Sequence, residues 1–140
     1  YEALSEPVKA LVSGLKAWNE SAHVHRDRFG DAGKLRDGDD SYPSSLHPIV
    51  RTHPVTGRKA LFVNENFTTR IESLKKNESD AILKMLYDHI ATPELHCRFQ
   101  WREKSVAFWD NRCAQHRSVW DYFPQVRHGY RVTIAGDRPF

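Results

Sequence analysis

The chain has 140 residues, a length that suits one domain and gives no reason to expect two. Hydrophobic residues make up 39%, which is enough for a core, and the charged share of 28% is close to that of an average soluble domain. The net charge of +3 comes from lysines and arginines that are scattered along the chain, which argues against a nucleic-acid or membrane-binding surface. Without a signal peptide or a long apolar run, the sequence predicts a cytoplasmic protein.

The chain begins at Tyr1 and enters a helical pattern directly, which favours an excerpt of a longer protein. Apolar residues at one-face helical spacing predict a helix over residues 2–17: Leu4, Val8, Leu11, Val12 and Leu15. The polar stretch over residues 19–45 is predicted to be a loop. Cys97 and Cys113 lack the spacing of a zinc site or a disulfide framework, so reduced thiols are expected.

Short strands are predicted over residues 47–52, 60–63 and 68–71, and a turn at residues 54–57 joins the first two in a hairpin. A helix is predicted over residues 78–90, with Asn77 or Ser79 as its cap. Further strands are predicted over residues 95–101, 105–109, 114–119 and 130–135. Short strands at close spacing indicate a mainly β fold with flanking helices, a β-sandwich or a jelly roll.

The most specific pattern is W-D-N-R at residues 109–112, followed by His116, then Arg127 eleven residues on and Arg131 four further. It resembles the carboxy-terminal end of the taurine dioxygenase family of Fe(II)- and 2-oxoglutarate-dependent dioxygenases, which also includes alkylsulfatases and enzymes acting on herbicides and xanthine. Further stretches resemble the same family at residues 1–7, 47–64 and 67–71. The resemblance implies a partial double-stranded β-helix (jelly roll), with residues 1–140 as the carboxy-terminal portion of a single catalytic domain.

The resemblance also implies roles for individual residues. His116 matches the second histidine of the triad that holds Fe(II), since neutral imidazole suits this metal. Arg127 matches the arginine that pairs with the far carboxylate of 2-oxoglutarate, where a guanidinium fork can make two parallel hydrogen bonds. Arg131 matches the arginine that binds the anionic head of the substrate. Phe67 matches a substrate-pocket aromatic, and Trp109 lies near the iron in the family.

Structural roles are the alternative for each of these residues. Without the surrounding motif, a lone histidine such as His116 would have about a one-in-five chance of binding metal, because histidine has many structural uses. Arg127 alone would be a surface charge, and Arg131 in a β run could be an ion-pair partner. Trp109 and Phe67 fit a plain core equally well.

Two of the three metal ligands are not found in their expected place. Of the eight histidines, only His25 begins a His-x-Asp sequence, ending at Asp27, and it stands in a polar loop rather than on a rigid strand. The family pattern puts this pair before the segment that resembles residues 1–7. These 140 residues alone are therefore expected to bind iron weakly and to lack dioxygenase activity, and no further catalytic residue is assigned.

Three functions remain open at this stage. The leading one is a dioxygenase that uses Fe(II), 2-oxoglutarate and O₂ to hydroxylate a small anionic substrate such as taurine or another sulfonate. The second is the same chemistry on a sulfate ester, an aryloxy acid or xanthine. The third is a truncated, non-catalytic fragment. Self-association is expected from the family, and neither nucleic acid nor a membrane is expected as a partner.

Overall fold

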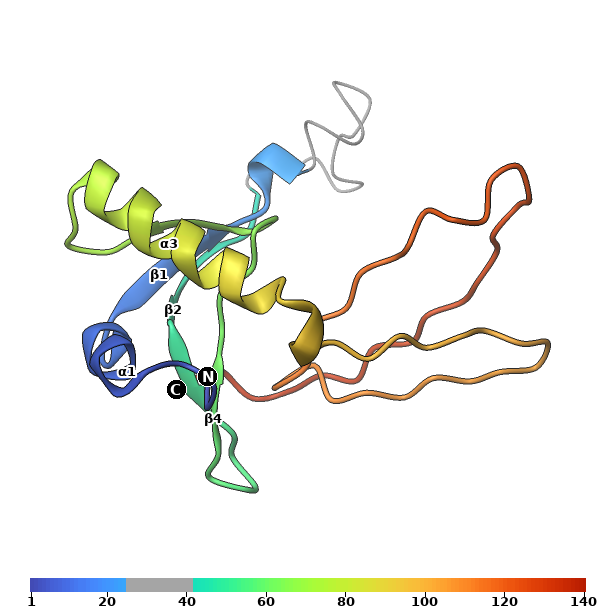
Figure 1. The fold of residues 1–140 in the computed structure, drawn as a ribbon, viewed down its shortest axis with the longest axis horizontal. Coiled ribbons are helices and arrows are strands. Elements are labelled where there is room, and N and C mark those ends of the chain that lie inside the picture. Colours follow the sequence, from blue (N-terminus) through green and yellow to red (C-terminus); the bar gives the residue numbers. More distant parts are fainter. Residues whose placement is uncertain (25–41) are drawn as a thin grey trace.

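The computed structural model describes residues 1–24 and 42–140 (Figure 1). In chain order the elements are α1 (Glu6–Val12), β1 (Lys16–Glu20), β2 (Ser44–Pro48), β3 (Val50–Thr52), β4 (Lys59–Leu61), β5 (Thr68–Ile71), α3 (Lys76–Ile90) and the 3₁₀ turn η2 (Pro93–Leu95). One antiparallel sheet has the order β2-β1-β5, and a second consists of β3 and β4. Strands outnumber helices among the described residues, in agreement with the predicted mainly β class. No helix in this part of the chain is long and apolar enough to cross a membrane.

Strand β1 occupies residues that the sequence assigned to the end of a helix and the start of a loop. Helix α1 stops at Val12, and Gly14 follows with a φ of +77°, a left-handed conformation that favours glycine. The chain then runs as β1 between β2 and β5, where Ala17 is 1% exposed. The predicted helix over residues 2–17 was therefore too long, because apolar spacing does not reveal where a turn redirects the chain. Most of the predicted loop, residues 25–41, lies outside the described residues, including His25 and Asp27.

The hairpin predicted around residues 54–57 is confirmed. Strands β3 and β4 pair antiparallel, and Gly57 adopts a φ of +69° in the turn between them. The N–H of Gly57 donates to the carbonyl of His53 at 2.9 Å, and the N–H of His53 donates to Arg58 at 2.8 Å. The predicted strand over residues 47–52 is divided into the end of β2 and β3 by Ile49. The side chain of Ile49 is fully buried in the core.

Helix α3 packs along the three-stranded sheet next to β5 (Figure 1). It begins two residues earlier than predicted, and the Glu78 carboxylate accepts a hydrogen bond from the N–H of Lys75 at 3.0 Å. The predicted caps, Asn77 and Ser79, were wrong because both residues lie inside the helix, whose cap position is Lys75. The hydroxyl of Ser79 instead accepts the N–H of Ile71 at 2.8 Å, inside the core. The core that joins the helices to the sheets comprises Leu4, Val12, Ala17, Ile49, Val63, Ile71, Leu83 and Leu86.

Residues 96–140 run as irregular, extended chain in long loops that reach away from the helices and sheets (Figure 1). The strands predicted at 95–101, 105–109, 114–119 and 130–135 are not formed, which corrects the sequence interpretation. Large apolar side chains there stay exposed, among them Trp120 at 82% and Val132 at 92%. A strand requires a hydrogen-bonded neighbour, and these segments have none among the described residues. Strand-like sequence was therefore insufficient to produce strands.

Candidate functional site

The W-D-N-R turn is attached through Asp110 to the folded body, by which we mean the helices and sheets within residues 1–24 and 42–95. The Asp110 carboxylate accepts hydrogen bonds from the Arg112 guanidinium at 2.8 and 3.0 Å and from the Arg112 N–H at 2.8 Å. It also contacts Nε2 of His53, in the β3–β4 hairpin, at 3.1 Å. The side-chain and backbone hydrogen bonds from Arg112, followed by that from His53, hold the pKa of Asp110 well below its usual range. The aspartate is therefore an anion that joins two segments 57 residues apart in sequence.

The partners of His53 determine its tautomer. Its Nδ1 lies 3.2 Å from the backbone N–H groups of both Val55 and Thr56, so this nitrogen accepts and carries no proton. The proton of the neutral ring must then be on Nε2, from which it is donated to Asp110. His53 is 9% exposed, so the bond to Asp110 is partly shielded from water.

Ligand-type atoms of His53, Asp110 and Cys113 lie within 4.8 Å of one another. The chemistry of this cluster does not suit a cation. The carboxylate is already paired with the Arg112 guanidinium, and the histidine nitrogen that faces it bears a proton rather than a free lone pair. The cluster is therefore a structural contact between the W-D-N-R turn and the β3–β4 hairpin. Cys113 is a free, exposed thiol, and so is Cys97.

A second fastening holds the end of the chain. Arg51 on β3 is 4% exposed and forms an ion pair with Asp137 at 2.6 Å. The guanidinium also lies 5.5 Å from the ring centroid of Phe62. Next to it, the N–H of Thr52 donates to the carbonyl of Phe140 at 2.8 Å. The segment that contains Arg127 and Arg131 is thus tied to the folded body at both ends, through residues 110 and 137.

His116 and Arg127, the predicted iron and 2-oxoglutarate residues, lie between these fastenings and are exposed. The His116 ring lies 4.6 Å from the Trp109 ring, centroid to centroid, and its nitrogens have no hydrogen-bond partner within residues 1–24 and 42–140. Arg127 donates to the hydroxyl of Ser118 at 2.7 Å and lies 6.0 Å from the ring of Tyr122. Its charge is therefore not neutralised by an acidic partner in the described part of the chain.

Arg131 and Phe67, the predicted substrate-binding residues, are also exposed, with Phe67 at 40%. Phe67 stands just before β5, and its carbonyl accepts the N–H of Glu20 at 2.8 Å. Arg131 lies in irregular chain because the predicted strand around it is not formed. No hydrogen bond, ion pair or ring contact joins any two of the four predicted site residues, all of which the structure describes.

His116 fits one ligand position of an iron site, because an exposed imidazole with unpartnered nitrogens can present a lone pair to the metal. Among the described residues, the one group of three ligand-type side chains is the cluster around Asp110, and it does not include His116. The described residues thus offer one ligand and do not by themselves complete a metal centre.

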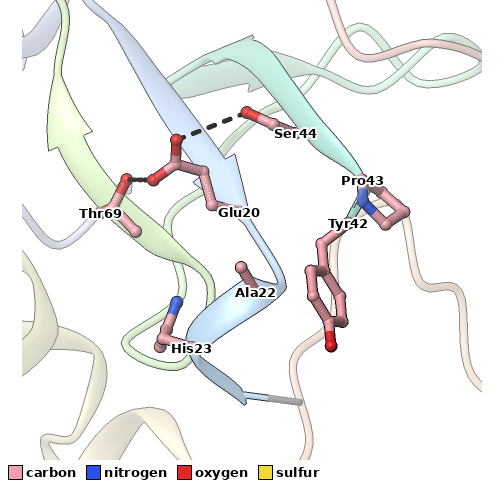
Figure 2. A pocket seen from close by; sticks show the side chains of 7 residues that line it. All are labelled: Glu20, Ala22, His23, Tyr42, Pro43, Ser44 and Thr69. Atoms are coloured by element: carbon pink, nitrogen blue, oxygen red, sulfur yellow. Dashed lines mark hydrogen bonds between the residues drawn. The ribbon is translucent and has the colours of Figure 1, made fainter. Parts of the chain in front are cut away.

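A hollow of about 530 Å³ lies at the end of β1 (Figure 2). It borders the backbone next to Phe67, since the N–H of its lining residue Glu20 donates to the Phe67 carbonyl. It is lined by Glu20, Ala22, His23, Tyr42, Pro43, Ser44 and Thr69. The Glu20 carboxylate accepts hydrogen bonds from Thr69 at 2.7 Å and Ser44 at 3.5 Å (Figure 2). Among the described residues, its lining includes the Glu20 carboxylate and no lysine or arginine, an arrangement that does not suit a keto-diacid, and none of His116, Arg127 and Arg131 lines it.

Comparison with known proteins identifies the family. The sequence pattern described as "Taurine catabolism dioxygenase TauD, TfdA family" matches residues 1–133. The chain belongs to the TauD/TfdA family. The matched range contains the W-D-N-R turn, His116, Arg127 and Arg131, so the resemblance noted in the sequence is confirmed.

Individual TauD/TfdA relatives cover the whole chain but extend well beyond it. A Schizosaccharomyces pombe protein, provisionally named as an alpha-ketoglutarate-dependent sulfonate dioxygenase, is 45% identical over 144 residues, which is 100% of this chain and 35% of that protein. A Pseudomonas putida protein named alpha-ketoglutarate-dependent sulfate ester dioxygenase is 34% identical, over 99% of this chain and 48% of its own. The structure of a taurine dioxygenase from Burkholderia xenovorans has a TM-score of 0.67 at 35% identity, over 81% of this chain and 34% of that chain. The chain thus spans between a third and a half of the curated relatives' length.

Sequence reasoning missed the residues that fasten this TauD/TfdA segment to the body. His53 and Arg51 both stood inside the stretch at residues 47–64 that carried the resemblance, but nothing local indicated their partners. The one available signal was the density of polar residues in otherwise strand-like sequence, because buried or half-buried polar groups require partners.

Proposed function

We propose that the protein carrying these residues is an Fe(II)- and 2-oxoglutarate-dependent dioxygenase that hydroxylates a small anionic substrate such as a sulfonate. Oxidative decarboxylation of 2-oxoglutarate would release succinate and CO₂. The observation that carries the proposal is the family match over residues 1–133, a range that contains His116, Arg127 and Arg131, the residues predicted to bind the metal and the two anions. The relatives named for sulfonate and sulfate ester substrates support an anion as the primary substrate.

In this proposal each site residue uses the chemistry of its own side chain. His116 would donate one imidazole lone pair to Fe(II), and its exposed ring, whose nitrogens make no hydrogen bond within the described residues, supports that role. Arg127 would bind the far carboxylate of 2-oxoglutarate, exchanging the neutral hydroxyl of Ser118 for a charged, bidentate partner. Arg131 would bind the substrate anion, and Phe67 would supply an apolar wall beside it.

Bound iron would supply the activation of O₂, while these side chains orient the two organic anions around it. We propose that residues 1–140 are the carboxy-terminal portion of one catalytic domain and that the His-x-Asp pair comes from residues outside them. Those residues outside 1–140 would also supply strands that pair with residues 96–140 and complete a double-stranded β-helix. The exposed apolar side chains of that segment support this, since such surfaces are normally covered. Cytoplasmic location and self-association stay predictions.

A non-catalytic fragment is the second candidate, favoured because His116 is the one proposed iron ligand among the described residues and belongs to no group of three ligand-type side chains there. The two candidates differ in one measurement on the natural full-length protein: succinate formed from 2-oxoglutarate with Fe(II), in the presence of taurine, an alkyl sulfate, an aryloxy acid or xanthine. The dioxygenase proposal expects succinate that depends on both iron and one of these substrates. Succinate that never exceeds the iron-free background, with every substrate, would leave only the non-catalytic candidate.

Two arginine variants test the assigned roles in the same assay. Arg127→Gln should raise the KM for 2-oxoglutarate, and Arg131→Gln should raise the KM for the substrate anion, each by about tenfold or more because a charge-assisted contact is lost. Arg102→Gln is the matched control, because Arg102 is exposed and its guanidinium has no partner among the described residues. If both site variants shift the same KM, or neither does, the assignment is wrong.

A further inference from the structure

Gln115, the residue before His116, has both ends of its side-chain amide engaged by the loop between β4 and β5. Its Nε2 donates to the carbonyl of Val63 at 2.8 Å. Its Oε1 accepts a hydrogen bond from Nδ2 of Asn64 at 3.3 Å. A glutamine that uses both amide atoms on consecutive residues is held in one orientation, which a single hydrogen bond would not achieve.

The orientation of Asn64 agrees with this arrangement. Its Oδ1 accepts the N–H of Asn66 at 2.9 Å, so its NH₂ group must face Gln115. Its own N–H donates to the hydroxyl of Thr68 at 2.9 Å, and that hydroxyl donates to Asn19 at 2.8 Å. Thr68 is 6% exposed. A continuous hydrogen-bond path therefore runs from β1 through β5 and the 64–67 turn to residue 115.

This path connects two predicted site elements. The 64–67 turn ends at Phe67, whose N–H donates to the carbonyl of Asn64 at 3.1 Å. Gln115 is bonded to His116 through the backbone, so a Gln115 side chain held against residues 63–64 limits where His116 can lie. On its other side the His116 ring contacts Trp109, next to the Asp110 that contacts His53.

Building on the proposed function, we propose that Gln115 is a positioning residue that fixes the iron-ligand segment at His116 relative to the substrate turn at residues 64–67. Asn64 is its partner in this role. Groups that orient a metal ligand typically change metal affinity or activity by about 10- to 100-fold when they are removed. Here the effect is expected at the lower end, since Gln115 acts through the backbone and its side chain is exposed.

The test uses the natural full-length protein without bound metal and Co(II) as the probe, with binding followed by tryptophan fluorescence. Gln115→Leu removes both hydrogen bonds at similar size and should weaken Co(II) binding about tenfold. Gln100→Leu is the matched control: Gln100 is exposed, and its amide has no partner among the described residues. Its Co(II) affinity should equal that of the wild type.

A second readout separates positioning from general destabilisation. In Gln115→Leu the ratio of succinate formed to substrate hydroxylated should rise. A displaced His116 segment would hold the metal too far from the substrate, so 2-oxoglutarate would be turned over without substrate hydroxylation. The melting temperature should stay near the wild-type value. If Gln115→Leu does not fold, Asn64→Asp provides the same test, since it keeps the acceptor for Asn66 but loses the donor to Gln115.

The outcomes distinguish this inference from the proposed function. Wild-type protein that forms no iron-dependent succinate refutes the proposed function. Co(II) affinity and succinate ratio that are unchanged in both Gln115→Leu and Asn64→Asp, in an active protein, refute the positioning role.

Discussion

The ion pair between Arg51 and Asp137 provides a quantitative test of how the terminal segment is held. The guanidinium side chain is 4% exposed and the carboxylate 34% exposed, and they meet at 2.6 Å. Removing one partner of a fully buried pair costs about 3–5 kcal/mol, whereas an exposed pair contributes about 0–1 kcal/mol. Asp137→Ala leaves the buried Arg51 guanidinium without its ion-pair partner, at a site that water reaches from the Asp137 side. We therefore expect it to lower the free energy of unfolding by about 1.5–3 kcal/mol.

A double-mutant cycle isolates the pair. Arg51→Met removes the buried charge together with its Nε, which has no hydrogen-bond partner within the described residues. With methionine at position 51, Asp137→Ala should cost little, which gives a coupling energy of about 1 kcal/mol or more. The measurement is urea unfolding followed by the helical circular dichroism signal, which α3 dominates. Asp121→Ala is the control, because Asp121 pairs with Arg98 where both side chains are mostly exposed, and its cost should stay below about 1 kcal/mol.

Hydrogen exchange locates the effect. The N–H of Thr52 donates to the carbonyl of Phe140, so Asp137→Ala should speed exchange at Thr52 as the terminal segment loosens. The N–H of Ile49, which donates to Leu15 inside the body, should keep its protection. Two results together would show that the Arg51–Asp137 pair does not hold the terminal segment. They are a coupling energy below about 0.5 kcal/mol, which means that the two mutations are additive, and unchanged hydrogen exchange at Thr52.

Three further predictions concern the folded body. Ser79→Ala should lower the free energy of unfolding by about 1–2 kcal/mol in urea, because the N–H of Ile71 loses its buried acceptor; a loss near zero would contradict that hydrogen bond. Burial, then two neighbouring arginines, lowers the pKa of His47, so its neutral form stabilises the fold above pH about 6.5 and this contribution is lost as the pH falls. Stability measured at pH 7.5 and at pH 5 should therefore differ less in His47→Gln than in the wild type. Burial raises the pKa of Tyr87 to about 12, and its hydroxyl donates to the carbonyl of Thr68 at 2.8 Å. Its contribution is complete below pH about 10 and is lost toward pH 12, and Tyr87→Phe should cost about 1 kcal/mol and remove one late-titrating tyrosine from the absorbance curve.

Local sequence predicted the elements whose partners lie nearby in the chain. The hairpin at residues 54–57, strand β5 and most of helix α3 each depend on turn residues or on a repeating apolar face within about fifteen residues. Strand β1 was missed because its partners are β2 and β5, and pairing with distant segments leaves no local pattern. The strands predicted beyond residue 95 failed for the converse reason, since the sequence suits a strand but no neighbour pairs with it among the described residues.

The sequence by itself determined the family and the identity of the candidate ligands, because a histidine and two arginines at fixed spacing form a pattern that survives without coordinates. The tertiary structure alone decided how that segment is attached. Three pairs of residues make this attachment: Asp110 with His53, Gln115 with Asn64, and Arg51 with Asp137. They are separated by 51 to 86 residues, so their contacts depend on the tertiary structure. Hydrogen bonds and ion pairs depend on distance and direction in space, and a linear sequence does not specify either until the chain has folded.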